Sequence, residues 1–230
     1  MTHTPLILGH RGASAELPEN TLEAFIRAGQ LGGDGVELDV RRSADGALIV
    51  NHDATTPDGR LIVEVEEFGL PLYMPNLRAA LEACAGKFVN IEIKNVPIDP
   101  DYDPDERIAA AVVSLVQEME IASRVVVSSF GLAAIDAVRA ADPSIPTGWL
   151  TISAYDQLRA LDTVVEHGHG ALHPHHTTVT PELMDAARAA GVLVNTWTVD
   201  DPVEMQRLAD MGVNAIITND VALAVQTLRG

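Results

Sequence analysis

Two carboxylates lie two residues apart in the segment GVELDV, at residues 35–40. Glu37 and Asp39 alternate with apolar residues, and this period of two predicts a β-strand with both acids on one face. The strand could be a solvated edge strand, which would keep both acids in water. Buried carboxylates without a partner are unfavourable and normally bind a cation. The choice depends on whether that face of the strand is covered.

A second segment, IEIK at residues 91–94, places Glu92 and Lys94 on one face in the same way. Three carboxylates with no thiolate form an oxygen-rich donor set, which suits Mg²⁺ or Ca²⁺ better than zinc. A divalent cation would offset the mutual repulsion of Glu37, Asp39 and Glu92. We therefore expect one divalent cation, Mg²⁺ or Ca²⁺, as the cofactor.

Histidine and arginine side chains occur at the ends of other apolar segments. His10 and Arg11 follow the segment LILG, and His52 ends the segment LIVNH. Two histidines can divide proton transfer between an attacking and a leaving oxygen. Arg11 and Lys94 suit an anionic ligand beside the metal, most simply a phosphate. These residue types together predict metal-assisted cleavage of a phosphoester.

The elements that would position these side chains alternate between strand-like and helix-like segments. This alternation implies a parallel sheet, and eight such units in 230 residues fit a (β/α)8 barrel of the TIM type. We expect residues 1–230 to form a single domain, with a short extra hairpin arm at 48–52 after the second strand. The expected strands are 6–10, 35–40, 87–94, 124–130, 146–151, 170–174, 192–199 and 214–219, and the expected helices are 20–31, 76–85, 105–119, 132–141, 155–167, 181–190, 202–210 and 219–229.

A barrel would cover both faces of the GVELDV strand, with helices outside and packed side chains inside. Glu37 and Asp39 would then point into the barrel near the carboxyl end of the strand, where barrel enzymes place their sites. This removes the solvated alternative for the two acids.

Helix-start signals support the expected boundaries. Asn20 followed by Glu23 is similar to a capping box, so we expect Asn20 to cap the first helix. Pro181 and Pro202 each stand at a first helical position, after a threonine and an aspartate. Glu19 is expected to have a structural role close to the site.

The composition argues against several classes of partner. With 33 acidic and 15 basic residues, the net charge of −18 argues against binding nucleic acid or an anionic membrane surface. No apolar run approaches the about 20 residues that span a bilayer, and we expect no signal peptide. The one cysteine, Cys84, is expected to be a buried, inert thiol. These features favour a cytoplasmic protein that acts on a small molecule without membrane insertion, and they leave a homodimer open.

Five histidines lie within ten residues in HGHGALHPHH at 167–176, a composition typical of zinc or nickel binding. A strand of about four residues, roughly 13 Å long, separates them into two groups. His167 and His169 should lie at the bottom of the barrel and the other three at or beyond its top, so the five cannot form one site. His173 ends the strand and is a candidate substrate contact, whereas we expect the others to be exposed loop residues.

The order of these motifs resembles the glycerophosphodiester phosphodiesterase family. The run LGHRGASAELPENTLEAFIRAGQLGGDGVELDVRRSADGALIVNHD is similar to the family's opening, with HRG, PENT, ExD and HD in that order. IEIK and the later run NTWTVDD with GVNAIITND match further motifs. The resemblance covers essentially the whole chain. It implies a TIM-type barrel that hydrolyses glycerophosphodiesters to an alcohol and sn-glycerol 3-phosphate.

The resemblance also implies roles for the residues at matching positions. His10 and His52 would be the acid–base pair, and Glu37, Asp39 and Glu92 would bind the metal. In such enzymes the glycerol 2-hydroxyl can attack phosphorus to give a cyclic phosphate that water then opens. The sequence leaves this route and direct attack by water both open.

Four further positions would bind the substrate. Arg11 and Lys94 would hold the phosphate, Trp197 would line the glycerol side of the pocket, and Phe130 would pack there. The chain departs from the family after HD, where ATTPDGRLIVEV is short and lacks an arginine before the threonines. That region can cover the substrate, so the departure bears on the alcohol headgroup.

Two alternatives stay open. The first is a phospholipase D-like barrel that releases a cyclic phosphate from lysophospholipids. Relatives of that kind are typically secreted and disulfide-bonded and have exposed apolar loops, and we expect none of these features here. The second is a non-catalytic phosphate- or metal-binding barrel. Such a protein would be expected to lack His10, His52 or one of the three acids, and this chain has all of them.

Overall fold

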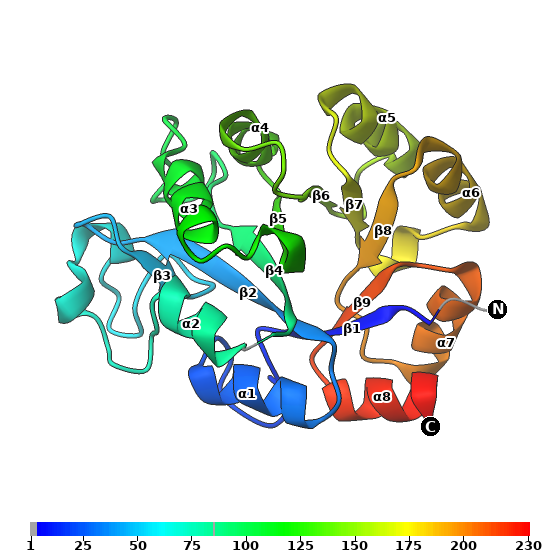
Figure 1. The fold of residues 1–230 in the computed structure, drawn as a ribbon, viewed down its shortest axis with the longest axis horizontal. Coiled ribbons are helices and arrows are strands. Elements are labelled where there is room, and N and C mark those ends of the chain that lie inside the picture. Colours follow the sequence, from blue (N-terminus) through cyan, green and yellow to red (C-terminus); the bar gives the residue numbers. More distant parts are fainter. Residues whose placement is uncertain (1–3, 85) are drawn as a thin grey trace.

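The strands of this protein form one sheet that closes on itself (Figure 1). The computed structural model describes residues 4–84 and 86–230, and within them the sheet has nine strands. The sheet follows the order β1-β9-β8-β7-β6-β5-β4-β2-β3, and pairing of β1 with β2 closes the barrel. The strands are β1 (Leu6–His10), β2 (Gly35–Arg42), β3 (Leu48–Val50), β4 (Phe88–Ile93), β5 (Val125–Ser129), β6 (Thr147–Thr151), β7 (Ala171–Pro174), β8 (Leu193–Thr196) and β9 (Ala215–Thr218).

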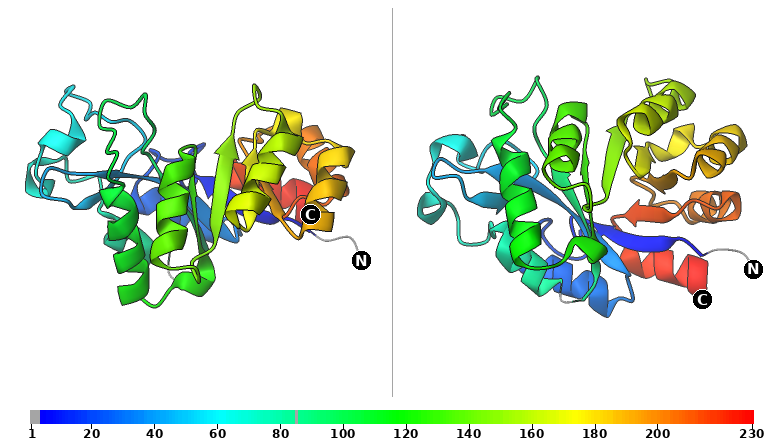
Figure 2. Two further views of the ribbon diagram at one scale, coloured as in Figure 1. Left: turned by 90° about the horizontal axis from the view of Figure 1, so that it is seen from above. Right: turned by 45° about the horizontal axis from the view of Figure 1, so that its top comes forward.

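Helices follow the parallel strands and surround the barrel (Figures 1 and 2). Each expected strand and helix is present with its ends shifted by a few residues, so the predicted (β/α)8 architecture is confirmed. The expected helix 76–85 includes residue 85, which lies outside the described residues. The α-helices are α1 (Leu22–Gln30), α2 (Leu77–Ala83), α3 (Arg107–Glu118), α4 (Leu132–Ala141), α5 (Gln157–His167), α6 (Pro181–Ala190), α7 (Pro202–Met211) and α8 (Val221–Arg229), and the 3₁₀ turns are η1 (Ile62–Glu64), η2 (Glu67–Gly69), η3 (Ala122–Arg124) and η4 (His176–Thr178).

Both faces of β2 are buried, as expected for a barrel strand. Val36, Leu38 and Val40 belong to the main apolar core, which includes side chains of the surrounding helices. Because side chains alternate along a strand, Glu37 and Asp39 face the barrel interior. Both acids are buried, so the prediction made for this strand is confirmed.

The register of the parallel strands brings the polar positions to one level. His10 of β1 is paired with Glu37 of β2, and Asp39 of β2 is paired with Glu92 of β4. Residues paired across parallel strands lie side by side on the same face of the sheet. The register therefore gathers these four side chains at the carboxyl end of the barrel.

The expected hairpin arm is also present. β3 runs antiparallel to β2, with Val40 paired to Val50. The segment that follows, cyan in Figure 2, lies at one side of the barrel and packs a small core of its own around Ile49 and Ile62. Phe68 and Leu72 in this segment are 87% and 104% exposed, so the expectation that the chain has no exposed apolar loop is wrong.

The cap of α1 differs from the prediction. Thr21 caps this helix by accepting a hydrogen bond from the backbone of Ala24, and Asn20 precedes it with a left-handed φ of 57°. The Asn20 side chain turns to β2 instead and donates to Asp39 Oδ2 at 2.9 Å. The proline-marked starts of α6 and α7 are confirmed.

None of the helices in the described ranges is both long and apolar enough to cross a membrane.

Candidate active site

Three carboxylates meet inside the carboxyl end of the barrel. Glu37, Asp39 and Glu92 are all buried, and one oxygen from each lies within 4.8 Å of the others. Within the part of the chain that the structure describes, Glu37 Oε1 has no hydrogen-bond partner. A buried carboxylate oxygen without a partner is costly, so this oxygen is suited to bind a cation. The donor set is all oxygen, as expected for Mg²⁺ or Ca²⁺.

The crowding of these acids alters their protonation. Burial, together with the charges of Asp39 and Glu92, raises the pKa of Glu37 well above its usual value. Burial also raises the pKa of Glu92, although Lys94 opposes it. For Asp39 burial acts in the same direction, but Lys94 and Arg11 outweigh it and its pKa lies below the usual value. Lys94 and Arg11 therefore compensate the charge of Asp39, whereas the charge of Glu37 is left without a sufficient counter-ion.

Two cations lie against the same acids. Lys94 Nζ lies 2.8 Å from Glu92 Oε1 and 3.6 Å from Asp39 Oδ1. Arg11 Nε lies 3.3 Å from Asp39 Oδ2, and Arg11 Nη1 donates to Glu19 Oε1 at 2.9 Å. Glu19 is thus close to the site, as expected. Both cations are placed where an anion bound beside the acids could reach them.

A tight turn after β1 aims the Arg11 backbone at the acids. Arg11 and Gly12 both adopt left-handed φ values, 56° and 87°. A side chain at position 12 would bring its Cβ to 2.7 Å from the backbone of Ala24, so only glycine fits there. The turn lets the Arg11 N–H donate to Glu37 Oε2 at 3.0 Å.

His10 is held in one orientation by a chain of polar contacts. Asn219 Nδ2 donates to Asp200 Oδ2 at 2.6 Å, which turns Asn219 Oδ1 toward His10. His10 Nδ1 therefore donates to Asn219 Oδ1, at 2.7 Å, and Nε2 carries the lone pair. His10 Nε2 lies 3.9 Å from Glu37 Oε2. Burial lowers the pKa of His10, although the Asn219 hydrogen bond opposes it. A neutral imidazole of this kind can accept a proton.

His52 stands at the end of the hairpin arm. Its Nδ1 lies 2.8 Å from Asp53 Oδ1, and its carbonyl accepts a hydrogen bond from Arg41 Nε at 2.8 Å. Arg41 is buried and also donates to Asp101 Oδ1 at 2.7 Å, in the loop after β4. Arg41 thus fixes the arm and the loop to each other beside His52.

A small cavity lies between these groups. Its volume is about 20 Å³, and its lining includes His10, Glu37, Glu92 and Trp197. A space of this size holds about one water molecule or one ion. Glu37, His10 and Trp197 thus border one small space inside the barrel mouth.

Aromatic side chains form one wall of the site. The Trp197 and Phe130 rings make an edge-to-face contact with centroids 5.4 Å apart, and Lys94 Nζ lies 5.8 Å from the Phe130 centroid. Trp197 Nε1 donates to the carbonyl of His173 at 2.9 Å. The structure therefore places both predicted aromatic residues beside Lys94 and the acids.

The histidines of 167–176 fall into the two expected groups, but their burial differs from the prediction. His173 is fully buried and contacts Asn195 through Nε2 at 2.9 Å, and its role as a substrate contact stays a prediction. Burial lowers the pKa of His173 to about 3. The expectation of exposed loop residues is wrong for His169, which is buried, and for His175 and His176, which are half-buried. His167 is exposed but is the last residue of α5.

Four residues of the site escaped the sequence analysis. Asn20, Asp200 and Asn219 stand in the runs PENT, NTWTVDD and GVNAIITND, which was the signal available. Their roles depend on contacts between distant segments, and no local pattern reveals such contacts. Arg41 could have been found, because it continues the period-two alternation of Glu37 and Asp39 along β2. The alternation would place the charged Arg41 side chain on the same face as the two acids, inside the barrel mouth.

Comparison with known proteins supports the family resemblance found in the sequence. The family model for the glycerophosphoryl diester phosphodiesterase family matches residues 10–223. A glycerophosphodiester phosphodiesterase from Caldanaerobacter subterraneus subsp. tengcongensis is 32% identical over 252 residues, which cover 97% of this chain and 98% of that protein. A crystal structure of a glycerophosphodiester phosphodiesterase from Thermotoga maritima has a TM-score of 0.83 at 27% identity, over 98% of this chain and 99% of that chain.

A phosphodiesterase from Oleispira antarctica, solved in complex with the product sn-glycerol-3-phosphate, has a TM-score of 0.86. It is 24% identical over 99% of this chain and 98% of that chain, an identity that shows a shared fold. The family match extends from His10 of the first motif almost to the end of the chain. This chain belongs to the glycerophosphoryl diester phosphodiesterase family and is a phosphodiesterase.

Proposed function

We propose that the protein hydrolyses glycerophosphodiesters to an alcohol and sn-glycerol 3-phosphate. One divalent cation, Mg²⁺ or Ca²⁺, and the pair His10 and His52 would carry the reaction. The observation that supports this most directly is the buried Glu37 Oε1 atom without a partner, at a cavity that His10 also lines. The two cations that a phosphate needs lie against acids of the same cluster, Lys94 against Glu92 and Arg11 against Asp39.

Glu37, Asp39 and Glu92 are the residues that would hold the cation. Their oxygens lie within 4.8 Å of one another, and the repulsion among them is relieved when a dication binds. The cation supplies charge stabilisation to a phosphoryl oxygen and helps to orient the substrate. Arg11 and Lys94 would share the remaining negative charge of the phosphate.

The two histidines would move the proton from the attacking to the leaving oxygen. His10 Nε2 carries a lone pair and would accept the proton of the attacking hydroxyl as the oxygen–phosphorus bond forms. Protonated His52, with Nδ1 on Asp53, would donate a proton to the alcohol oxygen as its bond to phosphorus breaks. The same division serves attack by the glycerol 2-hydroxyl, followed by hydrolysis of the cyclic phosphate, and direct attack by water.

Trp197 and Phe130 would pack against the glycerol portion. Their rings stand edge to face beside Lys94, so an apolar surface adjoins the phosphate position. We infer that residues 1–230 act as one catalytic domain. A cytoplasmic location and a homodimer stay predictions.

One observation favours a second candidate, release of a cyclic phosphate from lysophospholipids. Phe68 and Leu72 project from the segment after β3 and are almost fully exposed, as the apolar loops of an enzyme acting on lipid would be. The same site chemistry would then stop at the cyclic phosphate, and the acyl chain would lie along these side chains.

Product analysis by ³¹P NMR separates the two candidates. The protein is incubated with glycerophosphocholine, glycerophosphoethanolamine or lysophosphatidylcholine, in the presence of Mg²⁺ or Ca²⁺. Glycerol 3-phosphate from a glycerophosphodiester is the expected product. A stable cyclic phosphate from lysophosphatidylcholine alone would replace the main proposal by the second candidate. Wild-type turnover in both His10→Ala and His52→Ala would contradict the acid–base assignment.

A further inference from the structure

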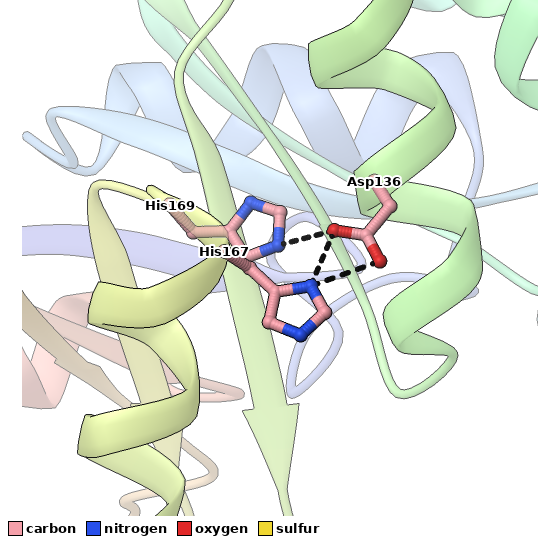
Figure 3. Close-up of side chains that lie close together, drawn as sticks. All are labelled: Asp136, His167 and His169. Atoms are coloured by element: carbon pink, nitrogen blue, oxygen red, sulfur yellow. Dashed lines mark hydrogen bonds and ion pairs between the residues drawn. The ribbon is translucent and has the colours of Figure 1, made fainter.

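Three potential metal ligands lie together at the opposite end of the barrel (Figure 3). Asp136 stands on α4, His167 is the last residue of α5, and His169 lies in the turn before β7. The turn precedes the amino end of β7, whereas the catalytic acids lie at the carboxyl end of the barrel. The cluster therefore belongs to a different face and is independent of the proposed phosphodiesterase chemistry.

The end of α5 brings the two imidazoles to one side. Gly168 caps the helix in the left-handed conformation, with φ of 73°, and the N–H of His169 returns to the carbonyl of Val164 at 2.9 Å. The two rings are nearly parallel, with centroids 6.0 Å apart. This helix cap presents both rings to α4, where the Asp136 carboxylate faces them from one side (Figure 3).

One carboxylate oxygen lies close to both rings. Asp136 Oδ1 is 2.9 Å from His167 Nδ1 and 3.1 Å from His169 Nε2. Metal bonds of about 2.0–2.2 Å in a tetrahedron place neighbouring donor atoms roughly 3.3 Å apart or slightly more. The donor atoms thus already stand within a few tenths of an ångström of that spacing on both sides of the carboxylate.

His169 supplies a second observation that points to a ligand. Its side chain is fully buried, and its Nε2 atom has no hydrogen-bond partner in the described part of the chain, although Asp136 Oδ1 is near. Its other ring nitrogen, Nδ1, lies 2.9 Å from Thr147 Oγ1. A ligating histidine usually has its second nitrogen engaged by an outer group in this way. The free nitrogen is aimed at the carboxylate.

The charged side chains around Asp136 leave its carboxylate to the two imidazoles. Arg139 packs over Gly168, where an added Cβ would lie 2.8 Å from its Nη2, and it forms no ion pair with Asp136 among the described residues. Within the described part of the chain, the Asp136 carboxylate therefore has only the two imidazoles as partners.

We propose that Asp136, His167 and His169 bind one transition-metal dication of the zinc class, Zn²⁺, Co²⁺ or Ni²⁺. Two imidazole nitrogens and one carboxylate oxygen suit these ions, whereas Mg²⁺ and Ca²⁺ prefer the oxygen-only cluster at the barrel mouth. Side-chain exposure of 37% at His167 and 40% at Asp136 leaves a fourth position open to water. The bound ion would join α4 to the turn before β7 and stabilise that side of the barrel.

Metal titration of the whole protein tests this proposal. The protein is stripped with chelator and titrated with Zn²⁺ by calorimetry, with Mg²⁺ in large excess to fill the acidic cluster. Binding of Co²⁺ is followed in parallel by its visible absorption, which is strong in a tetrahedral site containing nitrogen and weak in an octahedral oxygen site. We expect one Zn²⁺ per chain and the tetrahedral Co²⁺ spectrum in the wild type.

Matched variants place the ion at these residues. His167→Ala and Asp136→Asn alter partly exposed side chains, and both should lose the Co²⁺ spectrum and the rise in melting temperature that Zn²⁺ gives. Thr147→Val, which removes the group behind His169, should weaken Zn²⁺ binding about 10- to 100-fold. The controls are Glu166→Gln and His176→Ala, and these should bind as the wild type does. A wild type without a Zn²⁺ site of this kind, or equal Zn²⁺ affinity in the wild type, His167→Ala and Asp136→Asn, would overturn the proposal.

Discussion

His10 Nδ1 lies 2.7 Å from Asn219 Oδ1, although the two residues stand at opposite ends of the sequence. The pairing of β1 with β9 brings them together, and Asp200 holds the amide so that its oxygen faces the imidazole. The contact fixes which nitrogen of His10 is free. The barrel closure therefore orients the histidine as well as completing the fold.

Removing this contact should impair the reaction more than it impairs binding. Asn219→Ala frees the His10 ring and its tautomer, so we expect kcat to fall by about 10²-fold, at the lower end of what acid–base catalysis contributes. KM and the melting temperature should change little. Steady-state kinetics with glycerophosphocholine measure the change, with the exposed-residue variant Asp210→Asn as a control. An unchanged kcat in Asn219→Ala would show that Asn219 does not orient His10.

The buried Arg41 should be important for stability. Its guanidinium binds Asp101, whose side chain is also buried, so Arg41→Met leaves an uncompensated carboxylate. Removing one partner of such a pair typically costs about 3–5 kcal/mol of the free energy of unfolding. Arg78 pairs with Glu118 at the surface, and Arg78→Met should cost less than about 1 kcal/mol. Urea denaturation compares the two, and equal losses would contradict the role given to Arg41.

Neutralising Glu37 should separate stability from function. Its raised pKa shows that the charged form is unfavourable in the metal-free protein. Glu37→Gln relieves repulsion with Asp39 and Glu92 and keeps an acceptor for the Arg11 N–H. In EDTA this variant should melt at the same temperature as the wild type or higher, but Mg²⁺ or Ca²⁺ should no longer raise its melting temperature. A lower melting temperature in EDTA would argue against the strain assigned to Glu37.

The ion pair of Glu204 should add stability that acid removes. Hydrogen bonds from Arg207 lower the pKa of Glu204 to about 2, and His176 acts in the same direction. A carboxyl with a depressed pKa stabilises the fold above its unfolded pKa and loses this effect as the pH falls through its folded value. Glu204→Gln should therefore melt lower than the wild type at pH 7, and the gap should close between about pH 4.5 and pH 2. Glu66→Gln is an exposed control, and a gap independent of pH would contradict the assignment.

The strand–helix alternation was sufficient to predict the barrel, because periodicity and helix-start signals are local properties of the sequence. The acids of β2 and β4 could be predicted as neighbours, since strands of a parallel sheet end at the same level. The role of Asn20 could not be predicted, because its side chain binds Asp39 on a strand 19 residues further along the chain.

Contacts between distant segments were not accessible from the sequence. The histidine-rich composition of 167–176 is typical of metal binding, but from the sequence His167 and His169 are expected to be exposed loop residues. Their partner Asp136 comes from another helix, and only the packing of α4 against the turn before β7 reveals it. Asp200 and Asn219 likewise reach His10 only through the fold, because they lie far from it in the sequence. Polar residues in loops carry no periodicity, so only the folded chain shows which side chains they face.

The dependence of turnover on a divalent cation tests the central claim most directly. Hydrolysis of glycerophosphocholine is measured after EDTA treatment and again after Mg²⁺ or Ca²⁺ is added back, in the wild type and in Glu92→Gln. The site predicts that EDTA abolishes release of glycerol 3-phosphate, that one of the two ions restores it, and that Glu92→Gln needs a higher ion concentration or stays inactive. Undiminished hydrolysis in excess EDTA would contradict the assignment of Glu37, Asp39 and Glu92 as the ligands of a catalytic cation.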